Sequence, residues 1–255
     1  MKTPEPVEIV EVLGRANAGV STKPFKCRGE DGGLYYVKLG NSNVTGLQAE
    51  WIAGNLAKSM ALPVADFALV QVTRELAESL PNEHRELGHG IGFGSLSAPV
   101  GSRELQNSDV GKPQIFTTLA QLLAFDAWVQ NEDRKLGSVG GNPNALWLAA
   151  KARPLLLIDH DNAFDPTFEP STFLDNHLAR RAITHWFDVG HRAAWTEIAR
   201  SAAELVPAIW ESLPESWLFD TYGDPTPSLN CSVIESILAR PFSHSDEFWH
   251  LLTSS

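Results

Sequence analysis

The segments FDAWVQNEDRKLGSVGGNPNALW (125–147) and LLLIDHDNAF (155–164) carry the strongest structural signal in this sequence. The first runs from an apolar helix through a polar, glycine-rich loop into a strand, and the second is an apolar strand that ends in acidic residues. Asp133 lies in the loop just after the helix, and Asp159 directly follows Leu-Leu-Leu-Ile. A carboxylate beside apolar residues needs a cation or several hydrogen bonds to remain ionised. We therefore expect Asp159 either in a buried salt bridge or at a cation site.

Two asparagines, Asn142 and Asn144, close the loop that Asp133 opens. This set of groups is typical of phosphoryl transfer to a hydroxyl. One carboxylate receives the hydroxyl proton, while an asparagine and a second carboxylate hold Mg²⁺ against phosphate oxygens. The pattern makes Asp133 the candidate for the first role, and Asp159 with Asn142 or Asn144 the candidates for the second.

The region upstream of these segments is predicted to consist of strands with one helix. Residues 24–29 and 34–40 form a β-hairpin around the turn Asp31-Gly32-Gly33, because this turn chemistry is typical of hairpins. The other predicted elements are a strand over 7–13, a helix over 46–61 stopped by Pro63, and a strand over 67–72. These elements indicate a small mixed α and β unit.

Lys38 and Glu50 are the candidate charged pair of this unit. Lys38 alternates with apolar residues in Tyr-Tyr-Val-Lys-Leu, and Glu50 lies early in the predicted helix. A strand lysine paired with a helix glutamate can hold nucleotide phosphates, although each residue alone is more often a solvated surface charge. The small-residue loop over 15–24 could bring backbone N–H groups to phosphate oxygens, and an ordinary hairpin turn is the alternative.

Further along, residues 79–113 are rich in Gly, Ser, Pro and Asn and are expected to connect two lobes. A strongly apolar helix is predicted over 114–130, and the last third of the chain reads as helical, with five tryptophans that indicate a packed core. The histidines His177, His185 and His191 lack metal-ligand spacing and are interpreted as surface or capping groups.

Composition excludes several classes of function. The formal net charge of −11 disfavours nucleic acid and anionic membrane surfaces as partners. The two cysteines have no metal-ligand or disulfide spacing, and no leader or membrane-spanning run is visible, so we expect a cytoplasmic protein. A small phosphate ligand is still compatible with this charge, because a few local cations and backbone amides suffice to hold it.

The chain resembles the HipA-like kinases, especially their short stand-alone members. The resemblance rests on five features in order: GVSTKPFKCRGEDGGLYYVKL (19–39), GLQAEWIAGNLAKSMALPV (46–64), FGS (93–95), NEDR with NPN (131–144), and LLLIDHDNAF (155–164). It implies an α+β, two-lobed, protein-kinase-like fold with a β-rich N-terminal lobe (1–100) and a mainly helical C-terminal lobe (101–255). The family is similar in fold to protein and phosphoinositide kinases.

Carried over by residue, the resemblance implies that Lys38 contacts the ATP phosphates with Glu50 orienting it, and that Asp133 is the catalytic base. Mg²⁺ would be held by Asp159 together with Asn142, or Asn144. Asn142 lies nine residues after Asp133, farther along than relatives place it, because residues 136–141 intervene.

The nucleotide loop would contribute Gly19, Ser21 and Thr22 to ATP binding, and Ser21 or Thr22 could be a site of self-phosphorylation. The resemblance therefore implies an ATP- and Mg²⁺-dependent kinase acting on a serine or threonine of a protein. It further implies a toxin of a toxin–antitoxin system, with an antitoxin partner and a translation factor or aminoacyl-tRNA synthetase as substrate. A small-molecule or lipid kinase and a nucleotide-binding pseudokinase are the alternatives.

Overall fold

The computed structural model describes residues 2–16, 24–39, 43–137, 141–149, 151–180, 188–219, 222 and 229–253. The strands are β1 (Val7–Arg15), β2 (Phe25–Gly29), β3 (Leu34–Leu39), β4 (Phe67–Val72), β5 (Gly90–Leu96), β6 (Arg103–Glu104), β7 (Ala145–Trp147) and β8 (Leu155–Leu157). The α-helices are α1 (Val44–Ser59), α2 (Arg74–Ser79), α3 (Asn107–Val110), α4 (Phe116–Trp128), α5 (Pro170–Asn176), α6 (Val189–Ala203), α7 (Val206–Glu211), α8 (Cys231–Leu238), α9 (Arg240–Ser243) and α10 (Ser245–Thr253). Short 3-10 helices cover Asn82–Leu87, Pro113–Ile115 and Glu215–Trp217.

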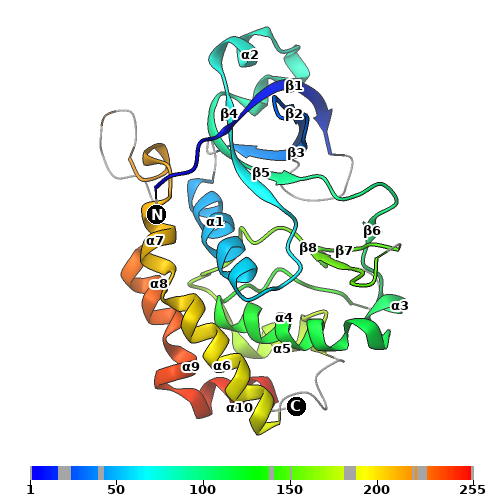
Figure 1. The fold of residues 1–255 in the computed structure, drawn as a ribbon, viewed down its shortest axis with the longest axis vertical. Helices are drawn as coiled ribbons and strands as arrows, with labels where there is room; N and C mark the ends of the chain where they lie inside the picture. Colours follow the sequence, from blue (N-terminus) through cyan, green and yellow to red (C-terminus); the bar gives the residue numbers. More distant parts are fainter. Residues whose placement is uncertain are drawn as a thin grey trace.

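Five strands close into a barrel in the order β1-β2-β3-β5-β4. All neighbours in it are antiparallel except β1 and β4, which run parallel. Alternate side chains of these strands point inward, and residues such as Ile9, Cys27 and Val37 form the apolar interior. Figure 1 shows the barrel at one end of the molecule, with the larger helices at the other.

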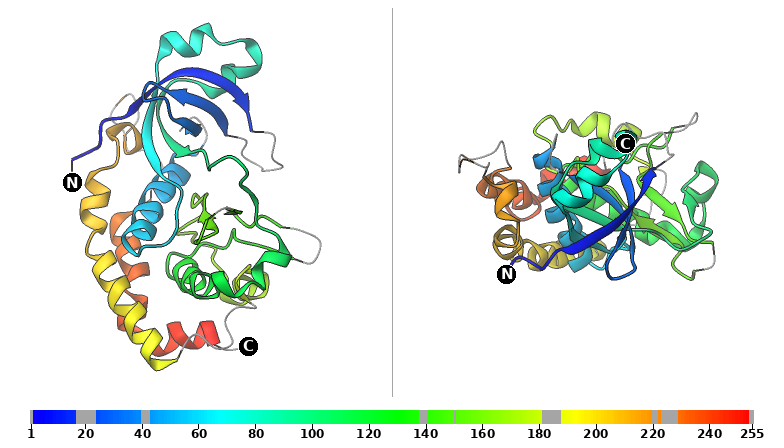
Figure 2. Two further views of the ribbon diagram at one scale, coloured as in Figure 1. Left: turned by 45° about the vertical axis from the view of Figure 1, so that its right-hand side comes forward. Right: turned by 90° about the horizontal axis from the view of Figure 1, so that it is seen from above.

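Helix α1 connects the barrel to the helical part. The side chain of Asn43 accepts a hydrogen bond from the backbone N–H of Gly46 and caps the start of the helix. Most residues of α1 are buried, because the helix packs against both parts of the chain. One apolar core contains Ile52 of α1 together with Phe93 of β5 and Leu123 of α4. The views in Figures 1 and 2 place α1 between the barrel and the long helices. Glu50 is thereby fixed at the junction of the two parts.

A second, three-stranded sheet in the order β6-β7-β8 lies beside α4. The backbone N–H of Ala65 donates to the carbonyl of Leu157, so the chain between α1 and β4 is tied to β8. Strands β7 and β8 are shorter than the sequence predicted, and Asp159 lies two residues beyond the end of β8.

The expectation that residues 79–113 connect two lobes was wrong for residues 90–96. Residues 90–96 form β5, which pairs with both β3 and β4 in the barrel. Gly92 and Gly94 allow this close packing, because an added Cβ would meet the Lys38 carbonyl and Val70 at less than 3 Å. The glycines that suggested a loop therefore belong to a buried strand.

The expected helical last third is present in the described residues, and Trp195, Trp217 and Trp249 are buried in its core as predicted. Trp210 is partly buried against the same core, whereas Trp186 lies outside the described residues. Among the helices described, none has the length and apolar character needed to cross a bilayer.

Candidate active site

Lys38 lies on β3, opposite Phe93 of β5, with its side chain 18% exposed. Its Nζ atom is 3.0 Å from Oε2 of Glu50, which comes from the first half of α1 and is almost fully buried. The two residues predicted to pair are thus brought together, and the strand lysine is no solvated edge residue.

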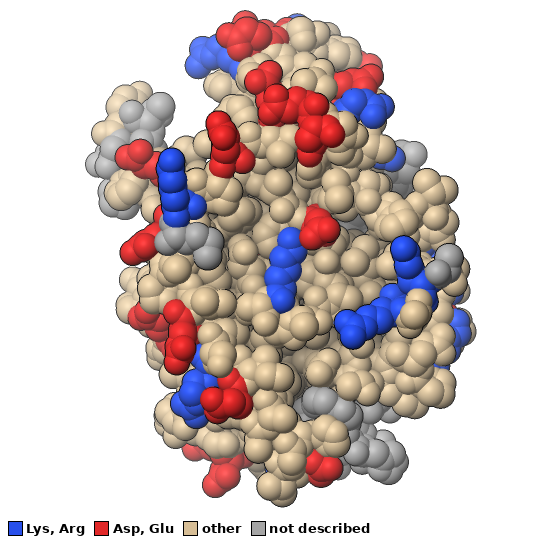
Figure 3. All heavy atoms as spheres, in the orientation of Figure 1, with Lys and Arg blue, Asp and Glu red and all other residues tan. Residues whose placement is uncertain are grey.

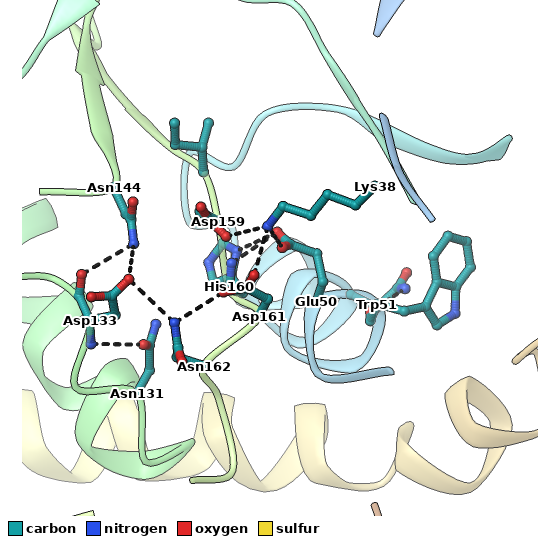
Figure 4. Close-up of polar contacts among 12 residues, drawn as sticks. Lys38, Glu50, Trp51, Asn131, Asp133, Asn144, Asp159, His160, Asp161 and Asn162 are labelled. Atoms are coloured by element: carbon teal, nitrogen blue, oxygen red, sulfur yellow. Dashed lines mark hydrogen bonds and ion pairs between the residues drawn. The ribbon is translucent and has the colours of Figure 1, made fainter. Parts of the chain in front are cut away.

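Two further carboxylates contact the same ammonium group. Oδ1 of Asp159 lies 2.5 Å from Nζ of Lys38, and Oδ2 of Asp161 lies 2.9 Å from it. Both aspartates follow β8, and Figure 4 shows Lys38 reaching from the barrel strand to the acidic residues beneath it. Residues more than a hundred positions apart in sequence therefore form one cluster, which we call the acidic trio: Glu50, Asp159 and Asp161.

The charges of this cluster are strongly coupled. Burial alone would lower the pKa of Lys38, but the three carboxylates raise it well above its usual value, so the ammonium stays charged. Burial raises the pKa of Glu50 to about 7 despite the nearby lysine. Burial and the charge of Asp159 also raise the pKa of Asp161, whereas Lys38 outweighs burial and holds the pKa of Asp159 below its usual value. The trio carries more negative charge than one lysine neutralises.

This excess of carboxylate oxygen fits a hard divalent cation. Each member of the trio can offer one oxygen, and these atoms lie within 4.8 Å of one another. Mg²⁺ is bound by one or two carboxylates in sites that also hold phosphate, so Asp159 and Asp161 suit it in number and chemistry.

Asp133 lies in the loop after α4, where amide groups surround its carboxylate. Asn142 Nδ2 is 2.8 Å and Asn144 Nδ2 is 3.0 Å from Oδ2 of Asp133. Asn162 reaches the same oxygen at 3.3 Å and also donates to Asp161 at 3.1 Å. Both predicted asparagines thus contact Asp133. Asn162 links Asp133 to the acidic trio, as Figure 4 shows. Burial raises the pKa of Asp133 in spite of the hydrogen bond from Asn144, which makes it a stronger base than a free aspartate.

The interpretation of His177 as a surface group was wrong, although the residue does occupy the C-cap position of α5, where its backbone N–H donates to the carbonyl of Phe173. Its side chain is fully buried, and its Nε2 lies 3.0 Å from Oδ2 of Asp126 in α4. His191 is exposed at the start of α6, as predicted for a surface group, and its backbone N–H donates to the side chain of Asp188, which caps the helix. His185 lies outside the described residues.

Sequence reasoning missed Asp161 and Asn162. The sequence contained a signal for both, because a second aspartate, Asp161, stands two positions after Asp159 and is followed directly by Asn162. The proposed nucleotide-loop residues Gly19, Ser21 and Thr22 lie outside the described residues, so their place relative to Lys38 stays a prediction.

A sequence model of one family, described as HipA-like kinase, matches residues 9–252 of this chain. A comparison with curated protein sequences found no match.

Among solved structures, the proinflammatory kinase CtkA of Helicobacter pylori is similar with a TM-score of 0.53 at 10% identity, covering 98% of each chain. A Golgi casein kinase has a TM-score of 0.48 at 15% identity, covering 97% of this chain and 74% of that one. HipA of Shewanella oneidensis, solved with HipB and operator DNA, has a TM-score of 0.40 at 12% identity, covering 98% of this chain and 67% of that one. The similarity to CtkA shows a kinase fold.

Proposed function

This chain belongs to the HipA-like kinase family, and on that basis we propose that it transfers the γ-phosphate of ATP to a serine or threonine hydroxyl of a protein, with Mg²⁺. One observation carries the proposal. Lys38 meets Glu50 and Asp159 within 3.0 Å, and a bridge through Asn162 connects that cluster to the carboxylate of Asp133. A cation for phosphate, carboxylates for a metal and a base for the hydroxyl are thereby adjacent.

The residues divide the chemistry between them. Lys38 would contact phosphate oxygens of ATP, and Glu50 would hold its ammonium in place after the lysine leaves the aspartates. Asp159 and Asp161 would hold Mg²⁺, which when bound neutralises charge on the phosphate oxygens. Asp133 would accept the proton of the attacking hydroxyl, and its raised pKa favours that role.

We also propose that the barrel and α1 act as an N-terminal lobe (1–100) and the remainder (101–255) as a C-terminal lobe, with ATP between them. In this arrangement Gly19, Ser21 and Thr22 would cover the phosphates. The position of Lys38 on the barrel and of Asp133 and Asp159 on the helical part supports this division.

The test is phosphate transfer from labelled Mg-ATP in a cell lysate, comparing the wild type with Asp133→Asn. Asp175→Asn, at an exposed position of α5, is the matched control. We expect a labelled protein with the wild type and the control, and at least about a hundredfold less label with Asp133→Asn. If Mg-ATP neither raises the melting temperature of the wild type nor is consumed by it, the kinase proposal is wrong.

For the biological setting we propose a cytoplasmic toxin of a toxin–antitoxin system, acting on a translation factor or an aminoacyl-tRNA synthetase, with an antitoxin as binding partner. Membership of the family supports this proposal. The charge of −11 favours protein over nucleic acid as the direct partner, and Figure 3 shows acidic side chains gathered at the barrel end of one face. Identification of the labelled lysate protein tests the substrate.

A nucleotide-binding pseudokinase is the second candidate, and the contacts of Asn142 favour it. The side-chain amide of Asn142 donates to Asp133, and the backbone carbonyl of Asn142 accepts from the N–H of Lys135. If a metal ligand is required from this loop, the lengthened segment 136–141 would leave the site incomplete. Stabilisation by Mg-ATP without transfer to any acceptor would identify this alternative.

A further inference from the structure

Arg134, the neighbour of Asp133, is a fully buried arginine whose guanidinium joins three segments of the site. Its Nε lies 3.0 Å from Oδ2 of Asp126 in α4. One terminal nitrogen, Nη1, donates to the backbone carbonyl of Asn144 and to that of Ile158, the latter at 3.0 Å. Asn144 contacts Asp133, and Ile158 directly precedes Asp159, so one side chain is bonded next to both functional aspartates.

The two carbonyls that Arg134 holds adjoin unusual backbone. Asn144 has a φ of 42° and Asp159 a φ of 59°, which places both in the left-handed region. A residue with a Cβ adopts this region at a cost and keeps it only where surrounding interactions require it. The bonds from Arg134 to Asn144 itself and to the residue before Asp159 are interactions of this kind.

The guanidinium of Arg134 is in turn fixed by its ion pair with the carboxylate of Asp126. This carboxylate accepts from Asn131 Nδ2 at 3.2 Å and from His177 Nε2 at 3.0 Å. His177 Nδ1 accepts from the backbone N–H of Ala179, so the ring proton lies on Nε2 and points at Asp126. Asn131 in turn accepts from the backbone N–H of Asp133 at 3.2 Å. The network therefore contacts Asp133 at two points. Asn131 binds its backbone N–H, and Asn144, whose carbonyl accepts from Arg134, binds its carboxylate.

We propose that Arg134 is a positioning residue that sets the separation of the catalytic base Asp133 from the metal-holding Asp159, with Asp126 and His177 fixing its guanidinium. The proposal rests on the function proposed above. Arginine is needed because two nitrogens at fixed positions of its planar guanidinium, Nε and Nη1, serve the carboxylate and the two carbonyls, whereas the three donors of lysine share one nitrogen. A small displacement of either aspartate would slow transfer more than it would weaken nucleotide binding at Lys38.

The experiment compares Arg134→Lys with Arg200→Lys, the same change at an exposed position of α6. For Arg134→Lys, we expect kcat to fall about 100-fold and the affinity for Mg²⁺, measured by calorimetry with a non-hydrolysable ATP analogue, to fall about tenfold. The affinity for the metal-free analogue should change less than about twofold, since Lys38 is untouched. Arg200→Lys should match the wild type in all three. A folded Arg134→Lys with kcat and Mg²⁺ affinity within about threefold of wild type overturns the proposal.

A second pair of variants decides the matter if Arg134→Lys does not fold. His177→Gln keeps an N–H donor for Asp126, and His177→Leu removes it. We expect His177→Leu to lower both Mg²⁺ affinity and kcat, and His177→Gln to retain most of both. Equal Mg²⁺ affinity and kcat in the two variants would overturn the proposal. The Mg²⁺ affinity needs no turnover. If the wild type transfers no phosphate, the proposed function fails while the role of Arg134 is still tested by metal affinity.

Discussion

Replacing Lys38 with methionine should destabilise the folded chain by leaving the acidic trio without its cation. The side chain of Lys38 is 18% exposed and contacts three carboxylates at 2.5 to 3.0 Å. With the lysine the cluster has a formal charge of −2, and without it −3. Methionine matches the length and apolar stem of lysine, so the change removes mainly the charge.

The size of the loss follows from these distances. At an effective dielectric constant of about 20, one pair of unit charges 3 Å apart interacts by roughly 5 kcal/mol, and desolvation of the ions offsets much of this. Breaking a buried ion pair by removing one partner typically costs about 3–5 kcal/mol, which is what we expect at pH 7.5.

The loss should shrink at lower pH. Without Lys38 the pKa values of the trio rise further, and that of Glu50 is already raised to about 7 by burial. The acidic trio of the folded variant then binds more protons than the trio of the folded wild type, while the same three carboxylates bind protons equally in the two unfolded chains. The stability difference therefore decreases as the pH falls from 7.5 to 5.5.

Urea unfolding of the wild type and Lys38→Met at both pH values, with and without Mg²⁺, measures this difference. Lys26→Met, a partly buried lysine on neighbouring β2, is the control and should cost less than about 1 kcal/mol. Mg²⁺ should stabilise Lys38→Met more than the wild type, because the metal would replace the missing cation. A cost for Lys38→Met equal to that of Lys26→Met, or one independent of pH, would refute the electrostatic account.

Three more predictions concern single side chains. Asp133→Asn should reduce the rate of phosphate transfer about 10²- to 10⁴-fold in a single-turnover assay, with the dissociation constant for Mg-ATP nearly unchanged. Asp161→Asn should weaken Mg²⁺ binding about tenfold in calorimetry and so remove about 1.4 kcal/mol of Mg-ATP stabilisation in thermal unfolding. Burial lowers the pKa of His160 to about 3, so the folded state keeps it neutral. The unfolded chain protonates this histidine below about pH 6.5 and the folded chain does not, so the free energy of unfolding falls with pH below that value. His160→Gln should therefore lose about 2 kcal/mol less unfolding free energy than the wild type between pH 7.5 and 5.

Each of these predictions has a contrary result. Unchanged transfer by Asp133→Asn would remove it as the base, and Asp175→Asn controls for the lost charge. Mg²⁺ affinity equal to wild type in Asp161→Asn would assign the metal to other groups. A parallel pH dependence of wild type and His160→Gln would mean that His160 does not control acid stability.

Local pattern was sufficient for most of the elements. The strand over Phe67–Val72, the β2–β3 hairpin and helices α1 and α4 were predicted within a few residues, because apolar periodicity and turn residues act over short distances. Glycine-rich β5 was missed, since its identity as a strand depends on pairing with β3 and β4, which approach it only in the folded barrel. Its glycines serve close packing, and in sequence they look the same as those of a loop.

What the sequence by itself determined is the chemistry of Lys38, Glu50, Asp133 and Asp159 and the order of elements that carry them, because residue type and local spacing are properties of the chain. The tertiary structure decided which groups share those charges. Asp161 and Asn162 became part of the site, and His177 and Arg134 were buried around Asp126, only when the helical part folded. Burial and ion pairing between residues far apart in sequence depend on how elements pack, and these contacts set the pKa values on which the proposed chemistry depends.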